Sequence, residues 1–150
     1  SYNPETLQLA DMLQAELSQI GIGITVETLD VLDDRLAAGE FNITAESYAM
    51  APIGTPGYFI NMVFRSSGPE NYGRYSSADV DELAERLSQS ADQEEQTSIA
   101  RQICQQVVND RPCDFVAGTQ LIFVTAKDVT GVKVNPSEYY MMTWDIGKNG

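Results

Sequence analysis

Hydrophobic and polar positions follow two different periods along the chain, and their order predicts its elements. From residue 4 to residue 20 apolar side chains recur every three or four positions, as in an amphipathic helix. Asn3 is a suitable N-cap for this helix and Pro4 a suitable first residue. Residues 22–26 then alternate between apolar and polar side chains, the period of a strand. A short helix, capped by Asp30 and ended by a glycine, is predicted to follow.

The segment of residues 41–75 begins as a strand and continues as a loop. Residues 41–46 show the alternation of a second strand. From Tyr48 onward, glycines and prolines interrupt a series of tyrosine, phenylalanine and methionine side chains. So many large apolar groups are unexpected in a solvated linker. We therefore expect the loop either to fold into a small packed unit or to line a concavity that holds a ligand.

Two helices and three short strands are predicted after this loop. Ser76 and Asp79 resemble a capping box at the start of the first helix, and Asp92 and Glu95 repeat the pattern at the second. Apolar residues at three- and four-residue spacing indicate that the two helices pack as a hairpin. A break at residues 110–112 ends the second helix. The strands are expected at residues 113–116, 121–125 and 129–134.

This order of elements predicts the α/β fold class. Helices that alternate with strands imply parallel strands joined by right-handed crossovers, so we expect a mixed, mostly parallel sheet flanked by helices. Ligands of such sheets bind beyond the carboxyl ends of the strands, which points to residues 48–53.

Length and charge exclude several classes of function. A chain of 150 residues suffices for one domain without metal or disulfide staples. Nine Lys and Arg against 22 Asp and Glu give a formal net charge of −13, so we expect no nucleic-acid partner. Without histidine, Ser–His and Cys–His nucleophile pairs and the usual zinc ligand are excluded. No signal pattern or membrane span is evident, and the abrupt start suggests a piece of a longer protein.

Acidic clusters are the first candidates for catalysis, because enzymatic chemistry here would have to rest on carboxylates. They lie on predicted helices, where adjacent side chains point about 100° apart and cannot converge on one bond. Solvated helix faces explain them better. The clusters are Asp33/Asp34, Asp79/Asp81/Glu82 and Glu94/Glu95. A carboxylate-based hydrolase is thus an alternative only, and we assign no catalytic residue and no cofactor.

Cys104 and Cys113 are the two cysteines of the chain. Two thiols without histidine make a poor metal site. In an oxidising compartment they could form a disulfide that closes a short loop and stabilises the fold by about 2–3 kcal/mol. A pair of buried free thiols is an equal alternative.

Five loop residues are candidates for contact with a ligand. A tyrosine just past a strand offers a ring for stacking and a hydroxyl for orientation. An arginine can clamp a ligand carboxylate, although an ordinary ion pair is the alternative. A methionine could be a soft metal ligand, although methionine more often fills a core. The candidates are Tyr48, Met50, Tyr58, Arg65 and Arg74. No residue is assigned to a metal.

The order of several segments resembles the large second lobe of the family 5 bacterial extracellular solute-binding proteins, the peptide- and nickel-binding receptors of ABC importers. The segments are LADMLQAELSQIGIGITVE, AAGEFNIT, GTPGYF, NYGRYSSADVDELAERL, DQEEQTSIARQICQQVVNDRP and VTGVKVNPSEYY. The resemblance implies a periplasmic-binding-protein-like lobe over residues 1–150, a fragment of a two-lobed protein that closes over its ligand. The strand that normally opens the family's lobe is missing.

The resemblance implies a transport receptor and not an enzyme. Such a receptor would deliver a small solute to the membrane permease of an ABC transporter, in the periplasm or elsewhere outside the cytoplasm, free or lipid-anchored. Dipeptide-binding members carry an aspartate in the loop, whereas here no carboxylate lies between Glu46 and Glu70. The loop is closer to members that take up nickel or a metal chelate, with a dipeptide or oligopeptide receptor as the alternative. Without histidine, the metal would enter as a complex whose carboxylates meet arginines.

Overall fold

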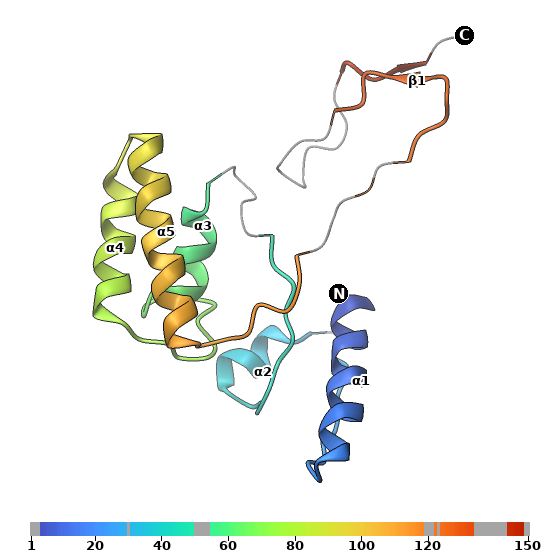
Figure 1. The fold of residues 1–150 in the computed structure, drawn as a ribbon, viewed down its shortest axis with the longest axis vertical. Coiled ribbons are helices and arrows are strands. Elements are labelled where there is room, and N and C mark those ends of the chain that lie inside the picture. Colours follow the sequence, from blue (N-terminus) through green and yellow to red (C-terminus); the bar gives the residue numbers. More distant parts are fainter. Residues whose placement is uncertain are drawn as a thin grey trace. The chain divides into compact units, whose positions relative to one another are not determined.

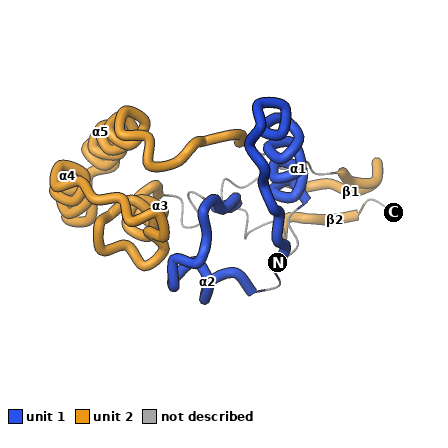
Figure 2. The backbone as a smooth tube through the Cα atoms, turned by 90° about the horizontal axis from the view of Figure 1, so that it is seen from below, with its two compact units in different colours: residues 1–48 blue, residues 49–150 orange. Residues whose placement is uncertain are grey.

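The structure is a computed structural model that describes residues 4–29, 31–49, 55–118, 122, 124–133 and 144–148. Its contacts divide the chain into two compact units, unit 1 of residues 1–48 and unit 2 of residues 49–150 (Figure 2). The single ligand-binding lobe over residues 1–150 stays a prediction.

Unit 1 contains two helices, α1 (Pro4–Gln19) and α2 (Asp33–Ala38) (Figure 1). Both predicted helices are confirmed, while their predicted caps, Asn3 and Asp30, lie outside the described residues. No residue of α1 is buried, so its apolar stripe covers no core in the described part of unit 1. Helix α2 ends as expected at a left-handed glycine, Gly39, with a φ of 72°.

Helices α4 (Ala78–Gln89) and α5 (Gln93–Asp110) of unit 2 form the predicted hairpin and lie side by side (Figure 1). Asp92 caps α5 by accepting the N–H of Glu95 at 2.7 Å, as predicted. The cap of α4 is Ser77, one residue later than predicted. The hairpin buries the apolar residues Val80, Ala84, Leu87, Ile99, Ala100, Ile103 and Val107.

Helix α3 (Gly57–Phe59) continues directly into a π-helix, η1 (Ile60–Phe64), and both contact α4 (Figure 1). The rings of Phe59 and Phe64 meet edge to face with centroids 5.2 Å apart. Phe64 also meets Tyr75 at 6.4 Å and Phe115 at 6.1 Å. The expectation that the loop folds into a small packed unit is therefore confirmed for its described part.

The strands β1 (Val129–Thr130) and β2 (Gly147–Lys148) pair antiparallel, with Val129 opposite Lys148 and Thr130 opposite Gly147. The chain leaves β1 through Gly131, whose φ of 78° suits glycine. A Cβ at this position would collide with the carbonyl of Asp145, so the close approach of the two chain segments also requires glycine.

The prediction of an α/β fold with a mixed, mostly parallel sheet is wrong. In the described part of the chain the structure is mostly helical, and its sheet is the two-stranded antiparallel pair of β1 and β2. Among the described residues of the predicted strands, only the first two of 129–134 join this sheet. No ladder forms in the described residues of the other predicted strands, at 22–26, 41–46, 113–116 and 121–125.

The alternating segments fail as strands because alternation shows which face could be buried but supplies no neighbouring strand. Without a neighbour, the apolar side chains stay open to solvent: Ile43 is 68% exposed and Val116 is 64% exposed. None of the helices in the described ranges is long and apolar enough to cross a membrane.

Candidate functional site

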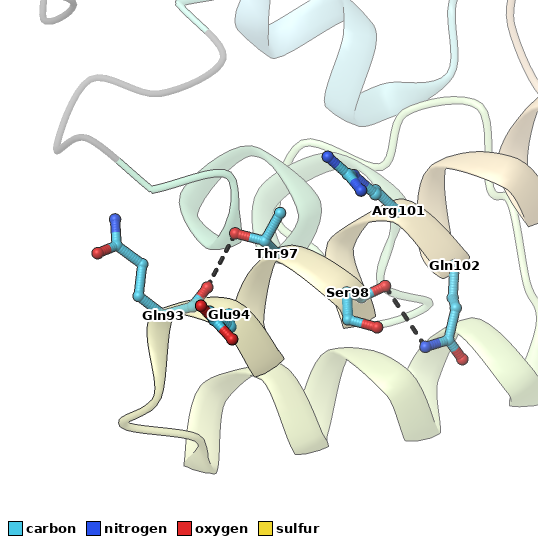
Figure 3. A pocket seen from close by; sticks show the side chains of 6 residues that line it. All are labelled: Gln93, Glu94, Thr97, Ser98, Arg101 and Gln102. Carbon is cyan, nitrogen blue, oxygen red and sulfur yellow. Dashed lines mark hydrogen bonds between the residues drawn. The ribbon is translucent and has the colours of Figure 1, made fainter.

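Two hollows of unit 2 are candidates for ligand contact. The larger, of about 640 Å³, follows the outer side of α5 (Figure 3). Thr97 and Gln102, which line it, donate to backbone carbonyls of the same helix. A single convex helix surface cannot enclose a ligand, so this hollow is a weak candidate. It is lined by Gln93, Glu94, Thr97, Ser98, Arg101 and Gln102.

The second hollow, of about 390 Å³, combines residues of α3, η1, α4 and α5. Its lining offers the exposed aromatic ring of Tyr58, the thioether of Met62 and the amide groups of Asn61 and Gln96. Aromatic and apolar surface with a few polar groups is typical of small-molecule sites. We call this hollow the Tyr58 groove; it is lined by Thr55, Pro56, Gly57, Tyr58, Asn61, Met62, Leu87, Ser88 and Gln96.

The π-helix η1 is stabilised by the loop that follows it. The N–H of Gly68 donates to the carbonyl of Arg65 at 2.8 Å, and the N–H of Glu70 donates to that of Met62 at 2.9 Å. A Cβ at Gly68 would lie 2.5 Å from the Met62 carbonyl oxygen. Glycine is thus the residue that lets the loop close over the carbonyls at the end of η1.

The side chain of Asn71 holds the two ends of the 65–75 loop together. Its Nδ2 donates to the carbonyls of Arg65 at 3.2 Å and Tyr75 at 2.7 Å. Its Oδ1 accepts the N–H of Tyr75 at 2.8 Å. All three bonds are partly buried, so this one amide satisfies backbone groups that would be costly to leave unpaired.

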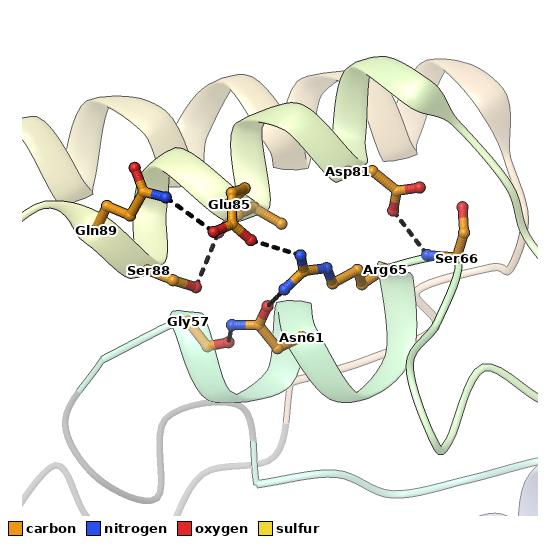
Figure 4. Close-up of polar contacts among 9 residues, drawn as sticks. Gly57, Asn61, Arg65, Ser66, Asp81, Glu85, Ser88 and Gln89 are labelled. Atoms are coloured by element: carbon orange, nitrogen blue, oxygen red, sulfur yellow. Dashed lines mark hydrogen bonds and ion pairs between the residues drawn. The ribbon is translucent and has the colours of Figure 1, made fainter.

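Arg65 belongs to a polar network on the side of α4 (Figure 4). Its Nη2 lies 2.6 Å from Oε2 of Glu85, and Gln89 donates to Oε1 of Glu85 at 2.8 Å. The hydrogen bond from Arg65, followed by that from Gln89, holds the pKa of Glu85 below its ordinary value. The next residue, Ser66, donates its N–H to Oδ1 of Asp81 at 2.8 Å. Helix α4 therefore anchors the chain at the end of η1.

Tyr75 links this loop to the end of α5, since its hydroxyl donates to Oδ2 of Asp110 at 2.5 Å. Burial, and next the hydrogen bond to Asp110, raise the pKa of Tyr75 above its ordinary value of 10.0. Because the pKa of Tyr75 is higher in the folded than in the unfolded state, the neutral tyrosine stabilises the fold. This stabilisation is complete below pH 10.0 and is lost as the pH rises through the folded-state pKa.

We expect Tyr75→Phe to lower the free energy of unfolding near neutral pH by about 1 kcal/mol, because it removes a hydrogen bond to a carboxylate. The variant should also lose less stability than the natural protein when the pH rises above 10.0, where the natural tyrosine ionises. Urea denaturation of both proteins near neutral pH and above the ordinary tyrosine pKa measures the two effects. Equal alkaline losses in both proteins would contradict the assigned role of Tyr75.

Of the five predicted ligand-facing residues, the structure brings Tyr58 into the groove. Arg65 pairs with Glu85, and its Nη1 lies 3.5 Å from the groove residue Asn61. Arg74 is exposed on a left-handed backbone with a φ of 55°, and in the described part of the chain it forms no ion pair. The remaining two are Tyr48, half-buried in unit 1, and Met50, which lies outside the described residues.

The sequence does not identify three residues that shape the site, namely Asn61, Asn71 and Glu85. A turn signal at Asn71 was available, because asparagine bonds readily to nearby backbone groups and is followed closely by Gly73. Nothing in the sequence marks Glu85, because its partner Arg65 lies twenty positions away and a distant pair leaves no local signal.

The cysteines and the acidic clusters add no chemistry to the groove. Cys104 and Cys113 are exposed with free thiols, so the expectation of buried thiols is wrong, and a disulfide stays a prediction. Although Cys113 is exposed as a residue, desolvation of its thiol, and then the charge of Asp114, raise its pKa. No acid lines the Tyr58 groove. Within the described ranges, no group of three or more His, Cys, Asp or Glu could hold a metal ion.

No family model matches the chain. The chain is 27% identical over 142 residues to the nickel-binding protein NikA of Staphylococcus aureus, a match that covers 94% of this chain and 29% of that protein. The chain therefore spans less than a third of the length of this curated relative.

Two solved structures share the fold. NikA from Staphylococcus aureus in complex with Ni(L-His)2 matches with a TM-score of 0.71 and 23% identity, over 97% of this chain and 32% of that one. A nickel ABC transporter from Bacillus halodurans matches with a TM-score of 0.75 and 21% identity, over 97% and 31% of the two chains.

The comparisons confirm the resemblance found in the sequence, and at their level of identity the two solved structures support the fold alone. The homology is carried by the curated relative: the chain is homologous to about 30% of the length of NikA, a family 5 solute-binding protein of nickel ABC transporters.

Proposed function

We propose that this chain is part of an extracytoplasmic receptor that captures nickel as a small chelate complex and delivers it to the permease of an ABC transporter. The observation that carries the proposal is the 27% identity to a nickel-binding protein over 94% of the chain. This homology is to a binding protein, which favours a receptor over an enzyme.

A chelate suits the chain better than a bare nickel ion. The sequence has no histidine, whereas NikA from Staphylococcus aureus was solved with Ni(L-His)2, a complex whose nitrogen ligands come with the metal. In our proposal the ring of Tyr58 packs against such a complex in the groove. Tyr48, Met50 and Arg74 stay predicted ligand residues, with Arg74 as the clamp for a carboxylate of the chelator. A second lobe of the parent chain supplies the opposing contacts.

The complete protein should be stabilised against heat by nickel and L-histidine together, and not by either alone. A ligand that binds only the folded state raises the melting temperature by mass action, equivalent to about 2.7 kcal/mol at a hundredfold excess over Kd. Thermal unfolding with each additive, with both, and with a panel of dipeptides measures this. Stabilisation by dipeptides alone would replace the proposal with a peptide receptor, and stabilisation by none of these would refute it.

A further inference from the structure

We infer that Arg65 is a positioning residue: together with Glu85 and Asn61 it fixes the backbone at Gly57 and so the ring of Tyr58, and it does not contact the ligand. The inference rests on the proposed function only where its test measures the binding of nickel with L-histidine. The sequence predicts both Arg65 and Arg74 as ligand clamps, whereas in the structure Arg65 pairs with Glu85 and Arg74 is exposed.

The donors of Arg65 are directed at protein groups. Nη2 lies 2.6 Å from Oε2 of Glu85 and Nη1 lies 3.5 Å from Oδ1 of Asn61, while the side chain is only 32% exposed. A short bond between two charged groups orients both partners. Arg74, in contrast, is exposed and forms no ion pair with any described residue.

Glu85 is held in place from its own helix. While Oε2 accepts from Arg65, Oε1 accepts from Nε2 of Gln89 at 2.8 Å. Both carboxylate oxygens are therefore engaged, and the carboxylate presents a fixed acceptor from α4 to the guanidinium (Figure 4).

The network reaches the start of α3 through Asn61, whose Nδ2 donates to the carbonyl of Gly57 at 2.8 Å. Tyr58 follows Gly57 directly and lines the groove. Ser66, the neighbour of Arg65, is bound to Asp81 at 2.8 Å, so two adjacent residues tie the end of η1 to α4. The backbone that carries Tyr58 is thus linked to α4 through Asn61 and the end of η1.

A π-helix is rarer than an α-helix and occurs mostly as single turns within α-helices, frequently at functional sites. If the Arg65–Glu85 pair is broken, η1 can relax toward α-helical geometry, which turns the residues before it about the helix axis. The ring of Tyr58 would then leave the orientation that it has in the groove.

The test swaps the charges of Arg65 and Glu85 in the complete protein and has two readouts. Arg65→Glu and Glu85→Arg, singly and together, are compared by hydrogen exchange of the amides of residues 60–66 and by the Kd for nickel with L-histidine. We expect each single variant to raise the exchange rates and the Kd at least tenfold. The double variant should lower both values again relative to the single variants, because the opposite charges meet again, but not to the natural values, because residue 65 no longer donates to Asn61.

Two matched controls separate positioning from contact. Glu82 and Arg86 lie on the same helix and form no ion pair within the described residues, so exchanging their charges should change neither readout. Arg74→Gln should raise the Kd and leave the amide exchange unchanged, as expected for a residue that contacts the ligand.

The inference is overturned if the double variant lowers the amide exchange relative to both single variants but leaves the Kd as high as they do, because Arg65 would then act on the ligand itself. It is also overturned if the single variants leave the exchange of residues 60–66 unchanged. If the natural protein binds no nickel with L-histidine, the proposed function fails, and the exchange rates still decide whether the pair fixes this backbone.

Discussion

Replacing Ile103 with alanine is expected to lower the free energy of unfolding by about 3–4 kcal/mol. Ile103 is 0% exposed in the hairpin of α4 and α5, where Val80 and Val107 are also buried. The substitution removes buried apolar surface and leaves a cavity that two packed helices can close only in part. Urea denaturation followed by circular dichroism measures the change.

The matched control is Val108→Ala, on the same helix and with 54% of the residue exposed. It should change the free energy of unfolding by no more than about 0.5 kcal/mol. Similar losses for Ile103→Ala and Val108→Ala would mean that Ile103 does not lie on the buried face of α5.

Replacing Gly68 with alanine is expected to cost about 2–3 kcal/mol, as for other insertions into a tightly packed site, and to weaken ligand binding as well. The added Cβ would lie 2.5 Å from the carbonyl oxygen of Met62 and 2.9 Å from those of Arg65 and Asn61. Since these are backbone atoms, the loop has to move away from η1. Denaturation gives the stability, and faster hydrogen exchange of the Glu70 amide reports the lost bond to Met62.

Gly73→Ala is the control for this prediction, because Gly73 lies in the same loop and a Cβ there would meet nothing within 4 Å. It should change the stability by no more than about 0.5 kcal/mol. If Gly73→Ala is as harmful as Gly68→Ala, the damage would come from the flexibility of the loop rather than from the carbonyls of η1.

The helices could be predicted because their signals are local. The Asp92 cap and the four-residue spacing of Ile99, Ile103 and Val107 require information from only a few adjacent turns. The sheet could not be predicted, since a strand such as residues 41–46 needs partners from distant parts of the chain. Alternation is necessary for a half-buried strand but does not provide its partners.

The candidate site shows the same limit. The aromatic, glycine- and proline-containing loop pointed to Tyr58, which does line a groove. The sequence could not separate Arg65 from Arg74, because the difference lies in Glu85, a residue of another helix. Nor did it indicate the π-helix, because no residue type in Ile60–Phe64 demands that geometry.

The π-helix also determines how this segment can change in length. Such a turn is commonly equivalent to an α-helix with one inserted residue. Deleting one residue from Ile60–Phe64 would therefore convert the turn to α-helix and leave Tyr58 and Phe64 on nearly the same faces, because the wider π-turn accommodates the extra residue. A relative with an ordinary α-helix here should align with a one-residue gap and still present the residue equivalent to Tyr58 to its groove. The turn geometry thus allows the segment to differ by one residue without moving the ring that lines the groove.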